Sequence, residues 1–418
     1  MGTPLRLAKA ERGMLEGEYG ECAAKAMEIL VKLGEAYNAA RMVKISSTHI
    51  ADLVYETIGD SGIAFIEDLA NKGAKVRVFT TTNVTGIDRR RLKEFEIYGA
   101  DYITKESRIL QALKRIGCAN TCSCTPYYFS NLPRFNEHVA WSESSTVPFI
   151  NSVLGARSNR EGCLSALMAA LTGRTPLYGY HLRENRLGKT LVKIRKHPKA
   201  THEYGILGYY IGQMVVDKVP VFSGLSRKIY TEDLVELGSG LGVSSVIGMY
   251  HIPGVTPETK TEQHMFRNEK PEETIEIEER DLRETCRKLC TGSGKIDIVA
   301  LGCPHYSLQQ LERASRLLEG KKVHEDVRLW IQTCEPVYAA AAHAGYVNVV
   351  SKAGGLVTVD TCASALGPLL RRSHGKLTIA TDSAKQAFYL GPGRGWHNVL
   401  LGSMEDCLKA AAKGSWEE

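Results

Sequence analysis

Long apolar stretches are absent from this 418-residue sequence. No stretch approaches the roughly 20 uninterrupted apolar residues that a membrane-spanning helix needs. The N-terminus also lacks the basic and then apolar pattern of a secretion signal. The sequence therefore predicts a cytoplasmic protein with no membrane partner.

A strong charge of one sign is also missing. Lys and Arg number 53 against 47 Asp and Glu, and the excess is spread along the chain without basic blocks interleaved with aromatics. Nucleic acid is therefore excluded as the expected partner. With 43% hydrophobic and 24% charged residues, the composition predicts an ordinary globular protein of two or three compact units.

Cysteine is plentiful, but no CxxC…CxxC array accompanies it. The odd count of eleven argues against a complete disulfide framework, and in a reducing compartment thiols serve as buried side chains, metal ligands or catalytic groups. Five cysteines lie in helix-like sequence and are expected to be small buried hydrophobes: Cys22, Cys163, Cys286, Cys290 and Cys407.

Hydrophobic periodicity predicts an α/β fold with mostly parallel sheets, divided into subdomains at 1–180, 181–290 and 291–418. The middle part is Gly-rich and β-branched, as in Leu237–Met249, and reads as a mixed subdomain. Ser307 and Gln310 form a capping-box pattern that opens a helix. The expected strands are Met42–Ser46, Val76–Thr80, His138–Trp141, Ile296–Leu301, Arg328–Gln332, Leu356–Val359 and Leu377–Thr381.

Polar motifs directly follow six of these strands, where open parallel sheets place their ligand sites. They offer hydroxyls, an amide, a carboxylate, two thiols and an amine, which would form one active site if they converge. The motifs are SSTH (46–49), TTTN (80–83), ESS (143–145), GCPH (302–305), DTCA (360–363) and SAK (383–385).

Two cysteines, Cys303 and Cys362, fall at predicted strand-to-helix turns, where free N–H groups and the helix dipole stabilise a thiolate. Either Cys122 or Cys124, in the loop NTCSCTPYY, is a candidate for a third ligand. Spacing alone is equally compatible with buried structural thiols, and three thiolates with water would also suit zinc.

Five longer runs resemble the aconitase X family, and the resemblance covers nearly the whole chain. They are TCSCTPYYFSNLPRFNEHVAWSESS, FINSVLGARSNREG, ALTGRTPLYGYHLRENRLGK, VALGCPH and VDTC. The resemblance implies an aconitase-like fold, with several three-layer α/β subdomains around a central cleft. It also implies an iron–sulfur cluster, of the [4Fe-4S] type, held by Cys124, Cys303 and Cys362, with Cys122 as a neighbour.

The resemblance further implies a hydro-lyase, in which the open iron acts as a Lewis acid on the departing hydroxyl. In related aconitases the proton is removed by a serine on a swivelling domain that this chain lacks, so a separate small subunit is expected to complete the site. By match, Glu143 and Ser144 are catalytic residues. The expected substrate-binding residues are Asn83, Ser47, Lys385 and Arg157, of which Ser47 and Arg157 equally suit a bracing role.

The family offers two substrates, (R)-5-phosphomevalonate and cis-3-hydroxy-L-proline, and the long motifs look more like the phosphomevalonate group. Two departures count against phosphate. The group tends to have small residues where this chain has Asp52, Leu53 and Val54, and often has Pro where it has Val84. A function of another class is a non-catalytic, metal-stabilised binding subunit.

Overall fold

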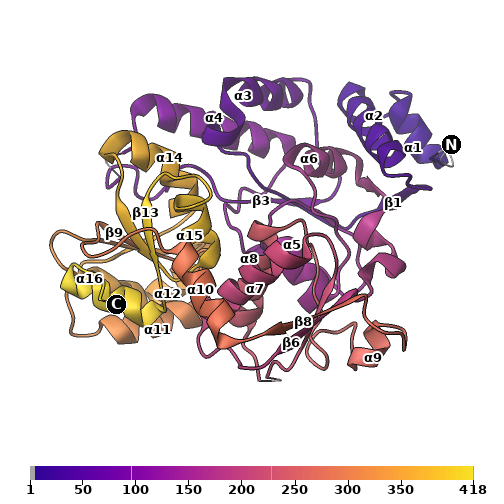
Figure 1. The fold of residues 1–418 in the computed structure, drawn as a ribbon. Helices are drawn as coiled ribbons and strands as arrows, with labels where there is room; N and C mark the ends of the chain where they lie inside the picture. The colour runs from indigo at the N-terminus through magenta and orange to yellow at the C-terminus, as the bar shows by residue number, and fades with distance from the viewer. Residues whose placement is uncertain (1–4, 96, 227, 418) are drawn as a thin grey trace.

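The computed structural model describes residues 5–95, 97–226 and 228–417, so the predicted outer limits at residues 1 and 418 lie outside the described residues. The chain forms three α/β regions that follow one another in sequence. In Figure 1 the first region lies along the top in indigo and purple, the middle region lies below it in magenta and orange, and the third lies at the left.

The first region contains a parallel sheet in the order β3-β2-β4 and an antiparallel pair of β1 with β5. Residues His49, Ile50 and Trp141 of this sheet are fully buried. Its strands and helices are α1 (Lys9–Leu15), α2 (Glu21–Ala36), β1 (Met42–Lys44), β2 (Ser47–Ile50), α3 (Tyr55–Asn71), β3 (Phe79–Thr82), α4 (Ala100–Ile116), β4 (Ala140–Trp141), α5 (Thr146–Phe149), α6 (Cys163–Thr172) and β5 (Arg174–Pro176).

The SSTH motif follows a strand, Met42–Lys44, as predicted, but this strand does not belong to the parallel sheet. Met42–Lys44 pairs antiparallel with Arg174–Pro176, and the motif itself supplies β2, with Ser47 opposite Phe79 and Ile50 opposite Thr82. Thr48 and His49 are buried within the sheet, so alternation of polar and apolar residues did not mark them as strand. β2 therefore ends at Ile50, and Asp52 lies two residues beyond it.

The Gly-rich middle region contains two long helices, α7 (Thr201–Val215) and α8 (Thr231–Ser244), where sequence reasoning left the structure open. Their backbones lie close together: a Cβ on Gly240 would lie 2.1 Å from the carbonyl oxygen of Gly205. Glycine therefore permits close helix packing here instead of breaking the helices. The other elements are β6 (Thr190–Ile194), β7 (Pro220–Ser223), α9 (Glu262–Met265), β8 (Glu273–Ile277) and α10 (Glu279–Leu289), with sheet order β7-β6-β8.

The third region is built on a five-stranded parallel sheet in the order β11-β10-β9-β12-β13. The predicted capping box is confirmed, because the Ser307 hydroxyl accepts a hydrogen bond from the backbone N–H of Gln310. The elements are β9 (Ile298–Leu301), α11 (Leu308–Leu318), β10 (Arg328–Gln332), α12 (Glu335–His343), α13 (Tyr346–Ala353), β11 (Leu356–Thr358), α14 (Ala363–His374), β12 (Thr378–Thr381), α15 (Ala384–Leu390), β13 (Asn398–Leu401) and α16 (Met404–Lys413).

The fold is thus α/β with mostly parallel sheets, as expected. Polar residues stand just beyond the carboxyl ends of strands in the first and third sheets, where such sheets bind ligands. None of the helices in the described part of the chain has the length and hydropathy needed to cross a membrane.

Candidate active site

Three buried thiols come from three separate turns. Cys124 lies in the loop after α4, Cys303 follows β9, and Cys362 is the N-cap of α14. The backbone N–H of His305 donates a hydrogen bond to the sulfur of Cys124 at 3.1 Å. The Cys303 sulfur lies 3.9 Å from the hydroxyl of Ser364, which is two residues after Cys362.

The pKa shifts show that these thiols share one electrostatic environment. Burial raises the pKa of each, and the nearby Cys362 raises that of Cys303 further. Cys303 in turn raises the pKa of Cys124, while the positive charge of Lys385 lowers all three. Cys303 therefore lies within interaction range of both Cys124 and Cys362, and Lys385 lies within range of all three.

Cys122 has different neighbours. Burial and then the charge of Asp360 raise its pKa to about 12, whereas Arg89 lowers it. Its backbone N–H lies 3.4 Å from the Thr82 hydroxyl. Cys122 thus belongs to the Arg89–Asp360 side of the loop, and Cys124 belongs to the side that meets His305 and Cys303.

Glu143 is the centre of a buried polar network just beyond β4. Its Oε1 atom accepts a hydrogen bond from the ammonium of Lys385. Its Oε2 atom accepts one from the Asn83 amide at 2.6 Å. Ser144 and Ser145 donate their hydroxyls to Oε1 at 3.2 and 3.1 Å. Four residues chosen from three strand-end motifs therefore meet, as the sequence predicted.

The Glu143 carboxylate is strongly anionic. Burial opposes its charge, but the charge and hydrogen bond of Lys385 outweigh this and lower the pKa of Glu143 to about 2. The pKa of Lys385 is raised by the same pair against the effect of burial. Lys385 is thus paired with Glu143 and is not an isolated cation.

A glycine lets the middle region approach this network. A Cβ on Gly242, near the end of α8, would lie 2.1 Å from the carbonyl oxygen of Ser144. Any larger residue would displace the Glu143–Ser144 turn. Gly242 therefore allows α8 to pack directly against the site. The middle region therefore supports residues supplied by the first region.

Two other predicted pocket residues lie elsewhere. Ser47 stands at the start of β2 and accepts a hydrogen bond from the Trp141 indole at 3.2 Å. Arg157 donates to the Asn136 side chain at 3.0 and 3.1 Å and to the carbonyl of His181 at 3.1 Å. These contacts favour the bracing interpretation for both residues.

Arg160, which sequence reasoning passed over, lies in the same long motif as Arg157. Its backbone forms a β-bridge with Trp141 in β4. Its side chain is half-buried, and the guanidinium donates a hydrogen bond to the carbonyl oxygen of Ser245. Its pKa is lowered by burial and raised by the charges of Tyr389, Glu143 and Asp52. Its position two residues before Gly162 in NREG carried no periodic signal that would distinguish it from Arg157.

His305 was also missed, although it closes the GCPH motif. Its Nδ1 lies 3.4 Å from the Ser123 hydroxyl and its Nε2 lies 3.1 Å from the carbonyl oxygen of Thr361. The buried ring thus contacts the residues that precede Cys124 and Cys362, and the His305 backbone bonds to Cys124 itself. His305 also belongs to the turn that contains Cys303. The pattern Cys-x-His was visible, but its long-range partners were not.

Three domain models of the aconitase X family match the chain. They cover residues 4–184 (first domain), 188–287 (second domain) and 296–413 (third domain). The chain belongs to the aconitase X family.

Its aconitase X relatives include named dehydratases. The chain is 39% identical to the phosphomevalonate dehydratase large subunit of Methanocaldococcus jannaschii, over 96% of this chain and 99% of that protein. It is 34% identical to the cis-3-hydroxy-L-proline dehydratase of Pseudomonas aeruginosa, over 98% of this chain and 70% of that protein. The crystal structure of Thermococcus kodakaraensis aconitase X (holo-form) superposes with a TM-score of 0.87 at 38% identity, covering 97% and 100% of the two chains.

Proposed function

We propose that this chain is the large subunit of a hydro-lyase that dehydrates (R)-5-phosphomevalonate at an iron–sulfur cluster. The observation that carries the proposal is the convergence of Cys124, Cys303 and Cys362 beside the Glu143–Lys385 pair. The full-length similarity to a phosphomevalonate dehydratase large subunit supports the substrate.

The donor set fits a cluster better than a single ion. Among the described residues, no three His, Cys, Asp or Glu side chains are placed to hold one metal ion, although three buried thiols interact. A zinc ion needs its ligands to converge on one point, whereas a four-iron cluster separates its cysteine sulfurs by several ångströms. We infer that Cys124, Cys303 and Cys362 hold a [4Fe-4S] cluster.

When bound, such a cluster supplies a Lewis-acidic iron for the departing hydroxyl. The chain's own residues orient the substrate. The Asn83 Oδ1 atom is buried without a hydrogen-bond partner within the described part of the chain, so it can accept a hydrogen bond from a substrate hydroxyl. The Lys385 ammonium has donors left after its bond to Glu143, and we assign these to a substrate carboxylate.

Glu143 does not suit the role of proton acceptor, because a carboxylate with a pKa of about 2 is a weak base at neutral pH. It orients the Asn83 amide and the Lys385 ammonium instead, and Ser144 helps to hold it. The base that removes the substrate proton is then expected on a small partner subunit. The phrase "large subunit" in the names of the relatives supports such a partner.

Arg160 is the best-placed cation for an anionic group at the far end of the substrate. It is half-buried and near Glu143, and its charge is not matched by a carboxylate hydrogen bond among the described residues. Arginine binds phosphate through a planar fork of donors. We therefore assign the phosphate to Arg160 in preference to Arg157.

A second candidate substrate is cis-3-hydroxy-L-proline, and Asp52 favours it. Desolvation raises the pKa of Asp52 most, the charge of Glu143 raises it further, and Lys385 and Arg160 lower it. The Asp52 carboxyl therefore lies near all three charged groups. A carboxylate at this place would repel a phosphate but attract the ammonium of an amino acid.

The experiment is to co-express the chain with its small partner, purify the complex without oxygen, and offer both substrates. Turnover of phosphomevalonate supports the proposal. Turnover of cis-3-hydroxy-L-proline alone would replace it with the second candidate. A folded complex that binds neither substrate would favour a non-catalytic binding subunit.

A further inference from the structure

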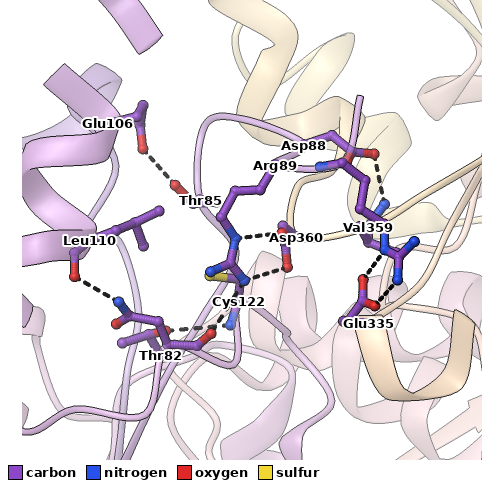
Figure 2. Close-up of polar contacts among 12 residues, drawn as sticks. Thr82, Thr85, Asp88, Arg89, Glu106, Leu110, Cys122, Glu335, Val359 and Asp360 are labelled. Atoms are coloured by element: carbon purple, nitrogen blue, oxygen red, sulfur yellow. Dashed lines mark hydrogen bonds and ion pairs between the residues drawn. The ribbon is translucent and has the colours of Figure 1, made fainter. Parts of the chain in front are cut away.

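The segment Thr85–Arg91 joins the first region to the third. The backbone N–H of Thr85 donates to the carbonyl of Asp360 at 2.8 Å, and the Asp88 carboxylate accepts from the N–H of Val359 at 3.0 Å. Arg90 pairs with Glu335. Figure 2 shows Asp88 bonded to Val359 at the turn that follows β11. This turn leads directly into Cys362.

Arg89 is the one residue of this segment whose side chain reaches both cysteine-bearing loops in the described structure. Its guanidinium donates to the two Asp360 oxygens at 2.7 and 3.0 Å, in a planar fork. The same group lies 3.4 Å from the carbonyl oxygen of Asn120. Asp360 is two residues before Cys362, and Asn120 is four before Cys124.

Both loops contain a backbone conformation that side chains rarely adopt. Asp360 has a φ of 66° and Cys122 has a φ of 45°. Such residues persist where the surrounding contacts over-determine them. Arg89 supplies part of that constraint to both: it pairs with the Asp360 side chain and bonds the Asn120 carbonyl just before Cys122. The Asp360 carboxylate is 3% exposed, so it depends on this partner.

We propose that Arg89 is a positioning residue for the cysteine ligands. By holding the Asp360 turn against the Asn120–Cys122 loop, it sets the distance between Cys362 and Cys124, and so determines how firmly the chain retains its cluster. Arg89 acts through these loops and does not touch the cysteines that it positions. The inference rests on the proposed function for its cluster, but the placement of the two thiols is a property of the chain itself.

A general stabilising contact between regions would predict the same result for Arg90 as for Arg89. Arg90 is the next residue, and its ion pair with Glu335 joins the same two regions, with 47% and 39% of the side chains exposed. Its side chain makes no hydrogen bond to the loop of Asn120 or to Asp360 in the described residues. Arg90→Gln is therefore the matched control.

The first measurement uses the cluster-free chain. Brief alkylation followed by peptide mapping reports how often each thiol becomes accessible, and circular dichroism confirms that each variant is folded. Loss of a charged hydrogen-bond pair is expected to increase the labelling rate of Cys362 and Cys124 about tenfold in Arg89→Gln, with a smaller increase in Arg89→Lys. Arg90→Gln is expected to stay within about twofold of the unaltered chain.

The second measurement uses the chain loaded with iron and sulfide under anaerobic conditions. Loss of absorbance in the presence of an iron chelator is expected to be about tenfold faster in Arg89→Gln than in Arg90→Gln. Equal rates of labelling and of cluster loss in the two variants would overturn the inference. If Arg89→Gln does not fold, the same comparison with Arg89→Lys decides.

The two proposals fail in different ways. An unaltered chain that takes up no iron and sulfide refutes the cluster, whereas the labelling comparison still decides the role of Arg89. An unaltered chain that loads normally, together with equal behaviour of Arg89→Gln and Arg90→Gln, refutes the positioning role and leaves the proposed function in place.

Discussion

The Nε2 atom of His305 lies 3.1 Å from the carbonyl oxygen of Thr361, the residue before Cys362. The same ring lies 3.4 Å from the hydroxyl of Ser123, the residue before Cys124. Since His305 itself follows Cys303 by two positions, one buried side chain ties together the turns of all three thiols.

His305→Ala is expected to reduce both stability and iron content. Removing the ring leaves a cavity and unpaired polar groups, which should cost about 2 to 4 kcal/mol of unfolding free energy. Urea unfolding of the cluster-free chain and an iron assay after reconstitution measure the two effects. The exposed His343 on α12 provides the control His343→Ala. Unchanged iron content in His305→Ala would contradict the linking role.

The buried pair of Lys385 with Glu143 predicts strong coupling. Lys385→Met strands a buried carboxylate and should lower the unfolding free energy by about 3 kcal/mol, and Glu143→Gln strands a buried ammonium with a similar cost. The double variant should lose at least about 1 kcal/mol less than the sum. Additive losses in a double-mutant cycle would show that the pair is not formed. Lys25→Met, in an exposed pair with Glu28, serves as the control.

The parts of the site that the sequence predicted are those whose position depends on neighbouring residues in the chain. Asn83 and Glu143 follow β3 and β4 of one parallel sheet, so their meeting could be predicted. Lys385 follows β12 of another sheet, and its contact with Glu143 depends on how the two sheets pack. Ser47 was expected just beyond a strand but begins β2, because the preceding strand, Met42–Lys44, pairs antiparallel with β5 instead of joining the parallel sheet. A short apolar run does not reveal its partner.

The remaining misses depend on long-range packing. Gly205 and Gly240 lie at the contact between α7 and α8, and a glycine gives no sign in sequence of whether it ends a helix or admits another. Arg160 and Arg157 lie in one motif, and only their tertiary contacts separate them. His305 and Arg89 each have a partner that lies more than 180 residues away in the sequence.

The close packing of α8 at Gly242 can be tested by a steric substitution. Gly242→Ala places a methyl group 2.1 Å from the Ser144 carbonyl, so the Glu143–Ser144 turn must move. Overpacking of this kind should cost about 1 to 3 kcal/mol, and activity should fall further than stability accounts for. Gly99→Ala, where a Cβ meets nothing within 4 Å, is the control. Full activity in Gly242→Ala would exclude this supporting contact.

His181 predicts how stability changes with pH. It stacks on His138 with 2.9 Å between their Nδ1 atoms, and burial, then the charges of His138, Arg186 and Arg157, lower its pKa from 6.5 to about 3. The unfolded chain therefore binds a proton below about pH 6.5 that the folded chain excludes, so stability falls as the pH falls from 6.5 toward 3.

Between about pH 7.5 and about pH 5, the unaltered chain should lose about 2 kcal/mol more unfolding free energy than His181→Phe does. Urea unfolding at the two pH values measures this difference, and His343→Ala should behave as the unaltered chain. An equal loss in His181→Phe would indicate that the buried ring is already protonated or has no depressed pKa.

The central claim, that three particular thiols hold an iron–sulfur cluster, is tested most directly by counting iron and acid-labile sulfide per chain after anaerobic reconstitution. The measurement compares Cys124→Ala, Cys303→Ala and Cys362→Ala with Cys122→Ala, whose thiol is buried two residues from Cys124. The account predicts about four iron and four sulfide in the unaltered chain and in Cys122→Ala, with loss of the cluster in the other three. A single zinc ion without sulfide, or a cluster that depends on Cys122 and survives Cys124→Ala, would contradict it.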